Sequence, residues 1–199
     1  MRAKLAPEHQ MTIEEFLAFT DTRPDEERWE LIEGIAVMNA APAEFHQVIA
    51  GNIVMLLSQI KLKTGAPWLA LLGVGMRVPA SPRSLPQPDV FVKSGPATDR
   101  PVTDDGLVLS EILSKSKTKA DQAWRKRVYA NIPNCQHYVT VAQNNVSVTR
   151  FDRSAGWQGG TLTSLDRKLA LPAVGKRAVL PLADIYRWTA VGKDRPVVG

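Results

Sequence analysis

Leu107-Val108-Leu109-Ser110-Glu111-Ile112-Leu113 is the stretch that decides the fold, because it is apolar except for Ser110 and Glu111. A short, nearly continuous apolar run predicts a strand with both faces buried, as at the centre of a sheet. Upstream, Pro88-Asp89-Val90-Phe91-Val92 predicts another short strand, and it also carries an acid, Asp89, near its start. The two stretches therefore predict a buried sheet that contains acidic side chains.

Hydrophobic spacing on either side of these strands predicts the remaining elements. The predicted helices cover residues 13–19, 44–63 and 119–131, with a short helix or turn at 182–188. The other predicted strands cover 29–32, 35–38, 68–78 with a bend, 136–142 and 145–151, with one or two more in 157–174. This order predicts an α/β (α+β) fold in which the two longer helices cover opposite faces of a mixed β-sheet.

Length and composition describe an ordinary globular chain. Its 199 residues suffice for one domain with a large core. Hydrophobic residues make up 44% and charged residues 23%, which excludes a disordered chain, a collagen-like repeat and a disulfide scaffold. We expect a single domain over residues 11–190, between a flexible N-terminus, 1–10, and a flexible C-terminal tail, 191–199.

Charge and cysteine usage limit the partners and the compartment. The net charge of +5 permits an anionic partner such as nucleic acid. Cys135 is the only cysteine, so neither an internal disulfide nor a cysteine-based zinc site can form, and a cytoplasmic location is expected. The apolar stretches are too short to span a membrane. Gly73-Val74-Gly75 lacks the rest of a nucleotide-binding fingerprint, so we expect no nucleotide cofactor.

Three acids occupy the apolar strands: Glu30, Asp89 and Glu111. Acids in such strands are costly to bury unless they are paired, hydrogen-bonded or bound to a metal. Carboxylates that converge on one point suit Mg²⁺, with Mn²⁺ as the alternative, and such a metal polarises a phosphoryl oxygen and lowers the pKa of a bound water. Each acid by itself could equally cap a strand, pair with an arginine or face solvent, and their spacing does not show whether they converge.

Basic residues follow the last of these acids. They are Lys115, Lys117, Lys119, Arg125, Lys126 and Arg127. Two interpretations stay open for this cluster: a solvated helix face, or a surface that contacts phosphates beside a metal site. His46 likewise is either a site residue or part of the exposed first turn of a helix.

Short motifs follow one another along most of the chain. They are Trp29–Gly34, Glu44–Gln47, Gln87–Val90 and Glu111–Ser114, followed by Asp121 and Tyr129. In this order they resemble the Uma-two family of putative restriction endonucleases, in the PD-(D/E)XK nuclease superfamily, over roughly residues 11–188. The resemblance implies a restriction-endonuclease-like core to which an N-terminal helix and a β-hairpin are added. It implies Asp89 and Glu111 as metal ligands, Glu30 facing the same site, and His46 and Gln47 nearby.

One position departs from the superfamily pattern, in which a lysine lies two residues after the second acid. Leu113 takes that position here, and the family has its lysine on the following helix, where this chain has Arg125. An arginine stabilises a phosphate but stays protonated, so it cannot be a general base. The neighbouring Lys126 could replace it if the helix turns by about 100°, and Lys115 and Lys117 are the alternatives on the preceding turn.

The resulting hypothesis is a Mg²⁺-dependent DNA endonuclease that acts as a homodimer, because duplex cleavage needs one site per strand. Asp89 and Glu111 would hold the metal, and Glu30 would hold a second metal or orient the water. Lys126, or less well Arg125, would stabilise the phosphate charge. The substrate contacts would come from His46, Gln47, Arg125, Lys115 and Lys117. Two other interpretations stay open: an inactive nuclease fold that serves as a DNA-binding or interaction module, and a hydrolase for RNA or a small phosphodiester.

Overall fold

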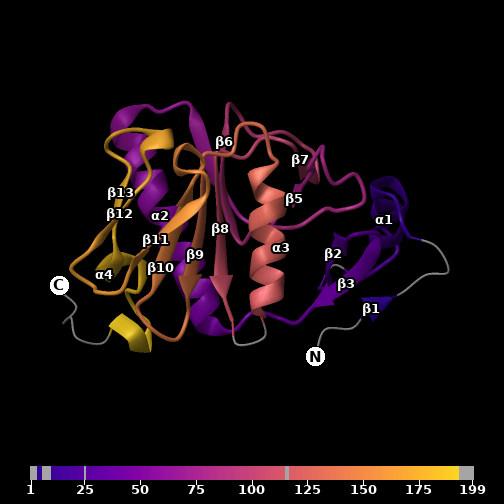
Figure 1. The fold of residues 1–199 in the computed structure, drawn as a ribbon, viewed down its shortest axis with the longest axis horizontal. Helices are drawn as coiled ribbons and strands as arrows, with labels where there is room; N and C mark the ends of the chain where they lie inside the picture. Colours follow the sequence, from indigo (N-terminus) through magenta and orange to yellow (C-terminus); the bar gives the residue numbers. More distant parts are fainter. Residues whose placement is uncertain (1–3, 6–9, 25, 115–116, 193–199) are drawn as a thin grey trace.

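A six-stranded mixed sheet forms the centre of the molecule (Figure 1). The computed structural model describes residues 4–5, 10–24, 26–114 and 117–192. In sheet order the strands are β11 (Gln158–Leu162), β10 (Val148–Asp152), β9 (His137–Ala142), β8 (Val108–Leu113), β6 (Val90–Ser94) and β4 (Trp68–Leu71). The pair β8 and β9 is parallel, and the other neighbouring pairs are antiparallel. The predicted mixed sheet is confirmed, and so is the interior position of β8 in it.

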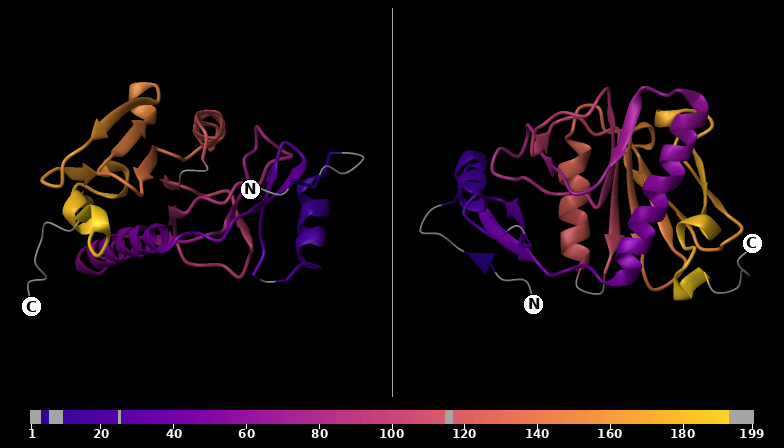
Figure 2. Two further views of the ribbon diagram at one scale, coloured as in Figure 1. Left: turned by 90° about the horizontal axis from the view of Figure 1, so that it is seen from below. Right: turned by 180° about the vertical axis from the view of Figure 1, so that it is seen from behind.

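Two helices cover the opposite faces of this sheet (Figure 2). They are α2 (Glu44–Thr64) and α3 (Lys119–Ala130). The chain passes through α3 between β8 and β9, because parallel neighbouring strands need a crossover connection. The prediction of an α/β (α+β) fold with one long helix on each face is therefore confirmed.

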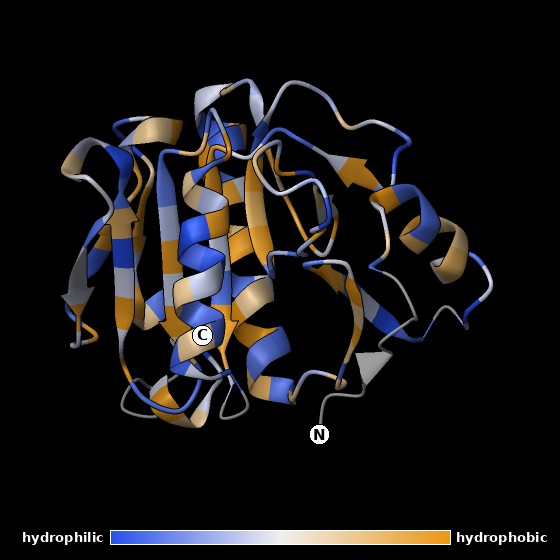
Figure 3. Cartoon of the chain, turned by 45° about the vertical axis from the view of Figure 1, so that its right-hand side comes forward, coloured by the Kyte–Doolittle hydropathy of each residue, from blue (hydrophilic) through white to orange (hydrophobic). Residues whose placement is uncertain are grey.

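Side chains of the sheet alternate between these helices, because successive residues of a strand point to opposite faces. Val90 and Val92 of β6 lie in the core beneath α2, whereas Phe91 between them lies in the core beneath α3. Ile112 of β8 also lies beneath α2, so the adjacent Glu111 faces α3. Hydrophobic residues are concentrated along the central strands (Figure 3), which makes the acid an exception in its surroundings.

An N-terminal unit packs beside the α3 face of the sheet (Figure 1). Its elements are α1 (Ile13–Thr20) and a three-stranded sheet of β1 (Lys4–Leu5), β3 (Ile35–Asn39) and β2 (Arg28–Ile32). Glu33 and Gly34 connect β2 to β3 with φ of 51° and 82°, as a two-residue hairpin turn requires. The Trp124 indole of α3 donates a hydrogen bond of 3.0 Å to the Glu33 carboxylate. The predicted helix and hairpin are thus confirmed, and the hairpin turn contacts α3.

The prediction of one bent strand over residues 68–78 is wrong. β4 ends at Leu71, and Gly73 follows with φ of 60°. The chain resumes as β5 (Gly75–Met76), which pairs in parallel with β7 (Val102–Thr103) in a separate small sheet. The left-handed backbone at Gly73 belongs to a connection between two sheets. The apolar composition of the stretch does not distinguish two short strands in different sheets from one bent strand.

The C-terminal elements extend the core beneath α2. They are the strands β12 (Lys168–Ala170) and β13 (Val179–Pro181), the short helix α4 (Leu182–Ile185), and 3₁₀ turns at Arg153–Ala155, Pro172–Val174 and Ala190–Gly192. Leu169, Leu180 and Ile185 of these elements are buried with the apolar face of α2. The predicted short helix near the end of the chain is confirmed.

The predicted flexible ends lie largely outside the described residues, which leave out 1–3, 6–9 and 193–199. Within the predicted N-terminus, Lys4–Leu5 forms β1 and pairs with β3. No helix in the described part of the chain combines the length and the apolar composition that crossing a membrane requires.

Candidate functional site

Asp89 and Glu111 meet at the α3 side of the sheet. Asp89 immediately precedes β6, and its Oδ2 accepts the backbone N–H of Ile112 in β8 at 2.7 Å. Glu111 is the residue before Ile112 and is fully buried. The Lys117 ammonium contacts both acids: its Nζ lies 3.2 Å from Asp89 Oδ2 and forms an ion pair with Glu111 Oε2. The two carboxylates therefore converge on one cation.

Lys117 reaches this position because it immediately precedes the start of α3. Thr118 is the N-cap of the helix, and its side chain and that of Asp121 form a reciprocal capping box. The cap fixes the start of α3, and the residue just before Thr118 lies next to the acids. Lys115, the other lysine predicted on this turn, lies outside the described residues.

Arg125 connects Glu111 to Glu30 inside the molecule. One guanidinium nitrogen donates to Glu111 Oε1 at 2.8 Å, and the other donates to Glu30 Oε2 at 2.6 Å. The Tyr129 hydroxyl also donates to Glu111 Oε1, at 2.7 Å. Arg125 and Tyr129 are four residues apart on α3, so both lie on the helix face that covers the sheet.

Glu30 is bound on all sides by protein donors. Its Oε1 accepts the backbone N–H of Gln87 at 2.7 Å, and its Oε2 accepts the Asn39 side-chain amide at 3.0 Å in addition to Arg125. Only 2% of the Glu30 side chain is exposed. The N-terminal hairpin thus supplies an acid whose two oxygens are both engaged within the described structure.

His46 lies at the open side of Asp89. It belongs to the first turn of α2, and its Nε2 is 3.2 Å from Asp89 Oδ2. Its Nδ1 is buried and has no hydrogen-bond partner among the described residues. The next residue, Gln47, is exposed on the helix. Of this predicted pair, the structure places His46 against an acid and Gln47 at the surface.

The charges of this cluster shift several pKa values. Burial raises the pKa of Asp89, but the hydrogen bond from His46 and the charge of Lys117 outweigh it, so the pKa lies below its ordinary value. For Glu30, burial is likewise outweighed by the charge and hydrogen bond of Arg125, and the pKa is lowered. Burial lowers the pKa of Lys117, yet the charges of Glu111 and Asp89 raise it overall. These three groups are therefore ionised at neutral pH.

Lys126 occupies a different place from its neighbour Arg125. Its Nζ lies 4.6 Å from the centroid of the Phe151 ring on β10. Successive helix residues differ by about 100° around the axis, so a helix that turns Arg125 toward the acids turns Lys126 along the sheet instead. Among the described lysines, Lys117 and not Lys126 contacts the acids.

Asp89 and Glu111 fit a divalent metal, whereas Glu30 does not fit as a direct ligand. Mg²⁺ in proteins is commonly bound by one or two carboxylates and several waters. Asp89 and Glu111 already face one cation, so a metal could replace Lys117 between them. Both Glu30 oxygens are taken by protein donors, and no three His, Cys, Asp or Glu side chains in the described part of the chain form a metal-binding group.

The sequence predicts no role for two partners of the acids, Tyr129 and Asn39. Tyr129 belongs to a family motif, and its spacing of four from Arg125 is the signal that places both on one helix face. Asn39 gave no signal in the sequence. It reaches Glu30 because β2 and β3 pair with Glu30 opposite Val37, which puts Asn39 two residues further along the same face.

Comparisons with known proteins agree with this architecture. The profile of the Uma2 family, described as putative restriction endonuclease, matches residues 13–182. A crystal structure of a putative nuclease of the DUF820 family from Anabaena variabilis superposes with a TM-score of 0.73 at 16% sequence identity, over 89% of this chain and 98% of that chain. No curated protein matches the sequence. Family and fold together indicate a restriction-endonuclease-like nuclease, and the chain belongs to the Uma2 family.

Proposed function

We propose that this protein is a Mg²⁺-dependent endonuclease that hydrolyses phosphodiester bonds of DNA, with Mn²⁺ as an alternative metal. The observation that carries the proposal is the convergence of Asp89 and Glu111 on one ammonium, that of Lys117. Two carboxylates in apolar surroundings are expensive to keep ionised. Their arrangement around a single cation-sized point supports a role in binding a metal together with a phosphate.

Each residue of the site has a distinct task in this proposal. Asp89 and Glu111 would hold the metal, which when bound would polarise a phosphoryl oxygen and lower the pKa of a water. Lys117 would leave the acids when the metal binds and place its ammonium against the phosphate, where charge develops in the transition state. Its raised pKa keeps it protonated, so it acts as a cation rather than as a general base.

Arg125 and Glu30 act by positioning other groups. The Arg125 side chain is 3% exposed and holds Glu30 and Glu111 at the same time. A buried arginine with two carboxylate partners does not reach a DNA backbone at the surface. It orients Glu111: Arg125 donates to the Oε1 of this acid, and the Oε2 faces Lys117.

Nicking of supercoiled plasmid DNA in Mg²⁺ or Mn²⁺ tests the proposal. Asp89→Asn is expected to reduce the nicking rate by at least about 100-fold, because a ligand carboxylate loses its charge. Glu111→Gln tests the second acid, and Glu14→Gln is its matched control, because Glu14 is 72% exposed and pairs with Arg77. Thermal unfolding of each variant separates loss of function from loss of fold.

The outcomes separate the proposal from its main alternative. No nicking by the wild type in either metal, together with DNA binding that survives Asp89→Asn, would identify a DNA-binding module on a nuclease fold. Equal nicking by the wild type and both acid variants would exclude the proposed metal site. Preferential cleavage of RNA or of a small phosphodiester would move the activity to another substrate.

We further propose a cytoplasmic homodimer. Cleavage of both strands of a duplex requires two active sites, and a two-fold symmetric dimer supplies them. Sedimentation with and without duplex DNA measures the mass. A monomer in both conditions, with nicking but no double-strand cleavage, would contradict the dimer and leave the metal site intact.

A further inference from the structure

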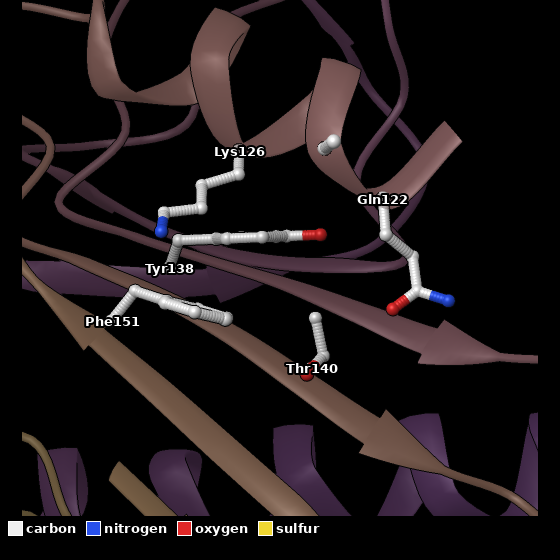
Figure 4. A pocket seen from close by; sticks show the side chains of 6 residues that line it. Gln122, Lys126, Tyr138, Thr140 and Phe151 are labelled. Carbon is white, nitrogen blue, oxygen red and sulfur yellow. The ribbon is translucent and has the colours of Figure 1, made fainter. Parts of the chain in front are cut away.

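A cavity of about 180 Å³ lies between α3 and the sheet (Figure 4). The residues that line it are Gln122, Ala123, Lys126, Tyr138, Thr140 and Phe151. Its wall is mostly apolar, although four of the lining residues carry a polar group: Gln122, Lys126, Tyr138 and Thr140. Apolar cavities of about 150 Å³ bind a benzene molecule in other proteins. The space therefore suits one six-membered ring with its substituents.

The cavity begins one strand away from Glu111. Thr140 of β9 is the register partner of Glu111 in the parallel pair with β8, so both side chains face α3. Neighbouring strands are about 4.8 Å apart. On the helix side, the Gln122 amide donates to the Lys117 carbonyl at 3.5 Å. A ligand in the cavity would thus lie next to any phosphate held at the acids.

Aromatic side chains form the floor of the cavity. The Tyr138 and Phe151 rings are stacked, with centroids 5.5 Å apart and planes inclined by 18°. Lys126 extends from α3 above Phe151, and Figure 4 shows the Tyr138 hydroxyl directed toward the side of Gln122 and Thr140. Stacked rings with amide and hydroxyl groups at their edge are the features that bind a nucleobase by its face and its polar edge.

The Tyr138 hydroxyl is the second, independent sign of a ligand. Tyr138 is 1% exposed, and its hydroxyl has no hydrogen-bond partner among the described residues. A buried hydroxyl without a partner costs free energy, and burial raises its pKa, which keeps it a donor. The Tyr138 hydroxyl is therefore a hydrogen-bond donor at the cavity that no described residue uses.

We propose that this cavity binds one unpaired pyrimidine base of the substrate strand, adjacent to the phosphate at Asp89 and Glu111. The inference rests on the proposed function, because the phosphate at the acids belongs to the same strand. Tyr138, Thr140 and Gln122 contact the edge of the base, and Phe151 provides the aromatic surface. Lys126, whose ammonium lies over Phe151, neutralises the neighbouring phosphate of the strand.

Fluorescence anisotropy with short labelled single strands tests this, in Ca²⁺ and with a gel to confirm that the DNA stays uncut. The probes are oligothymidylate, oligoadenylate and a strand of the same length without bases. Oligothymidylate is expected to bind about fivefold to 150-fold more tightly than the base-free strand, the range for one base stacked on an aromatic side chain. Oligoadenylate is expected to bind more weakly than oligothymidylate, because a double ring is larger than the single six-membered ring that a space of about 180 Å³ suits.

Tyr138→Phe and Tyr186→Phe form a matched pair of variants. Tyr138→Phe should lower the preference for oligothymidylate about twofold to tenfold, the effect of one hydrogen bond, without lowering the melting temperature. Tyr186→Phe should lower the melting temperature and leave the preference for oligothymidylate unchanged. The Tyr186 hydroxyl donates to the Ser147 carbonyl at 3.1 Å in the core beneath α2. Ala123→Leu, at an exposed position of the cavity rim, should remove the preference by filling the space.

Each outcome either supports or overturns the proposed base-binding cavity. Equal affinity for the strands with and without bases, no measurable binding of oligothymidylate, or equal binding of oligoadenylate would overturn the pyrimidine cavity, whereas plasmid nicking decides the nuclease separately. Thymidine monophosphate that binds as tightly as the strand, with the same dependence on Tyr138, would make this a site for a free nucleotide and also overturn the inference. A preference that depends on Tyr138 in a protein that cuts no DNA would support the cavity and refute the nuclease.

Discussion

The charged cluster has a closed end and an open end, and Glu111 belongs to both. At the closed end, Arg125 holds Glu30 and Glu111 with side-chain exposures of 3%, 2% and 0%. At the open end, Asp89 is 19% exposed and Lys117 is 10% exposed. The two oxygens of Glu111 divide between the ends, since Oε1 faces Arg125 and Oε2 faces Lys117.

The difference separates architecture from chemistry. The ion pair of Arg125 is buried too deeply for water or a ligand to replace its partners. Breaking it leaves an uncompensated buried charge. The partly exposed contacts of Lys117 can be exchanged for those of a metal and a phosphate. The closed end should therefore determine stability, and the open end should determine activity.

Arg125→Met breaks the closed end and should have the largest effect on stability. It leaves Glu30 and Glu111 buried without their shared cation, which is expected to cost about 3–5 kcal/mol in the free energy of unfolding. Urea denaturation measures the loss. Arg127→Met is the control, because Arg127 is 68% exposed and pairs with Glu33 at 3.5 Å, so its loss should cost at most about 1 kcal/mol. A cost for Arg125→Met as small as that of the control would contradict the division into two ends.

Lys117→Met breaks the open end and should reduce activity. Loss of one cation that faces the developing phosphate charge is expected to lower kcat for nicking about 100- to 1000-fold, with a smaller change in unfolding free energy than for Arg125→Met. Lys119→Met, at an exposed position of the first turn of α3, is the control. A larger loss of kcat for Lys126→Met than for Lys117→Met would instead favour the lysine chosen from the sequence.

The smallest expected effect concerns how the stability of the fold depends on acidic pH. Asp89 and Glu30 have lowered pKa values in the folded protein. Their contribution to stability is therefore complete above the unfolded pKa of about 4 and is lost as the pH falls toward the folded pKa. The urea concentration at the unfolding midpoint should therefore decrease as the pH is lowered below about 4. Asp89→Asn should make this decrease smaller, because one of the two acids no longer titrates, but should not abolish it, because Glu30 still does. Asp99 is exposed and serves as the control. If the urea midpoint of Asp89→Asn depends on pH as steeply as that of Asp99→Asn, Asp89 does not contribute to the acid sensitivity.

The sequence located the acids but left their lysine undecided. Apolar strands marked Asp89 and Glu111, since an acid in such a run needs a compensating partner wherever it lies. Lys117 was one of three lysines that could have replaced the lysine of the superfamily motif. The five residues that connect β8 to α3 have no hydrophobic periodicity, so the sequence does not predict which side chain faces the acids. Only the capping box at Thr118 and the pairing of β6 with β8 bring its ammonium to both carboxylates.

The sequence by itself determined the order of the main elements, the mixed sheet between two helices and the family, because these follow from local hydrophobic periodicity and short motifs. The tertiary structure decided which charges meet. Glu30 and Arg125 are 95 residues apart in the sequence, yet they form one buried pair, because β2 pairs in a hairpin that packs against α3. Contacts of this kind depend on the helix rotation and the strand register. Those are set by packing over the whole domain, so no local pattern encodes them.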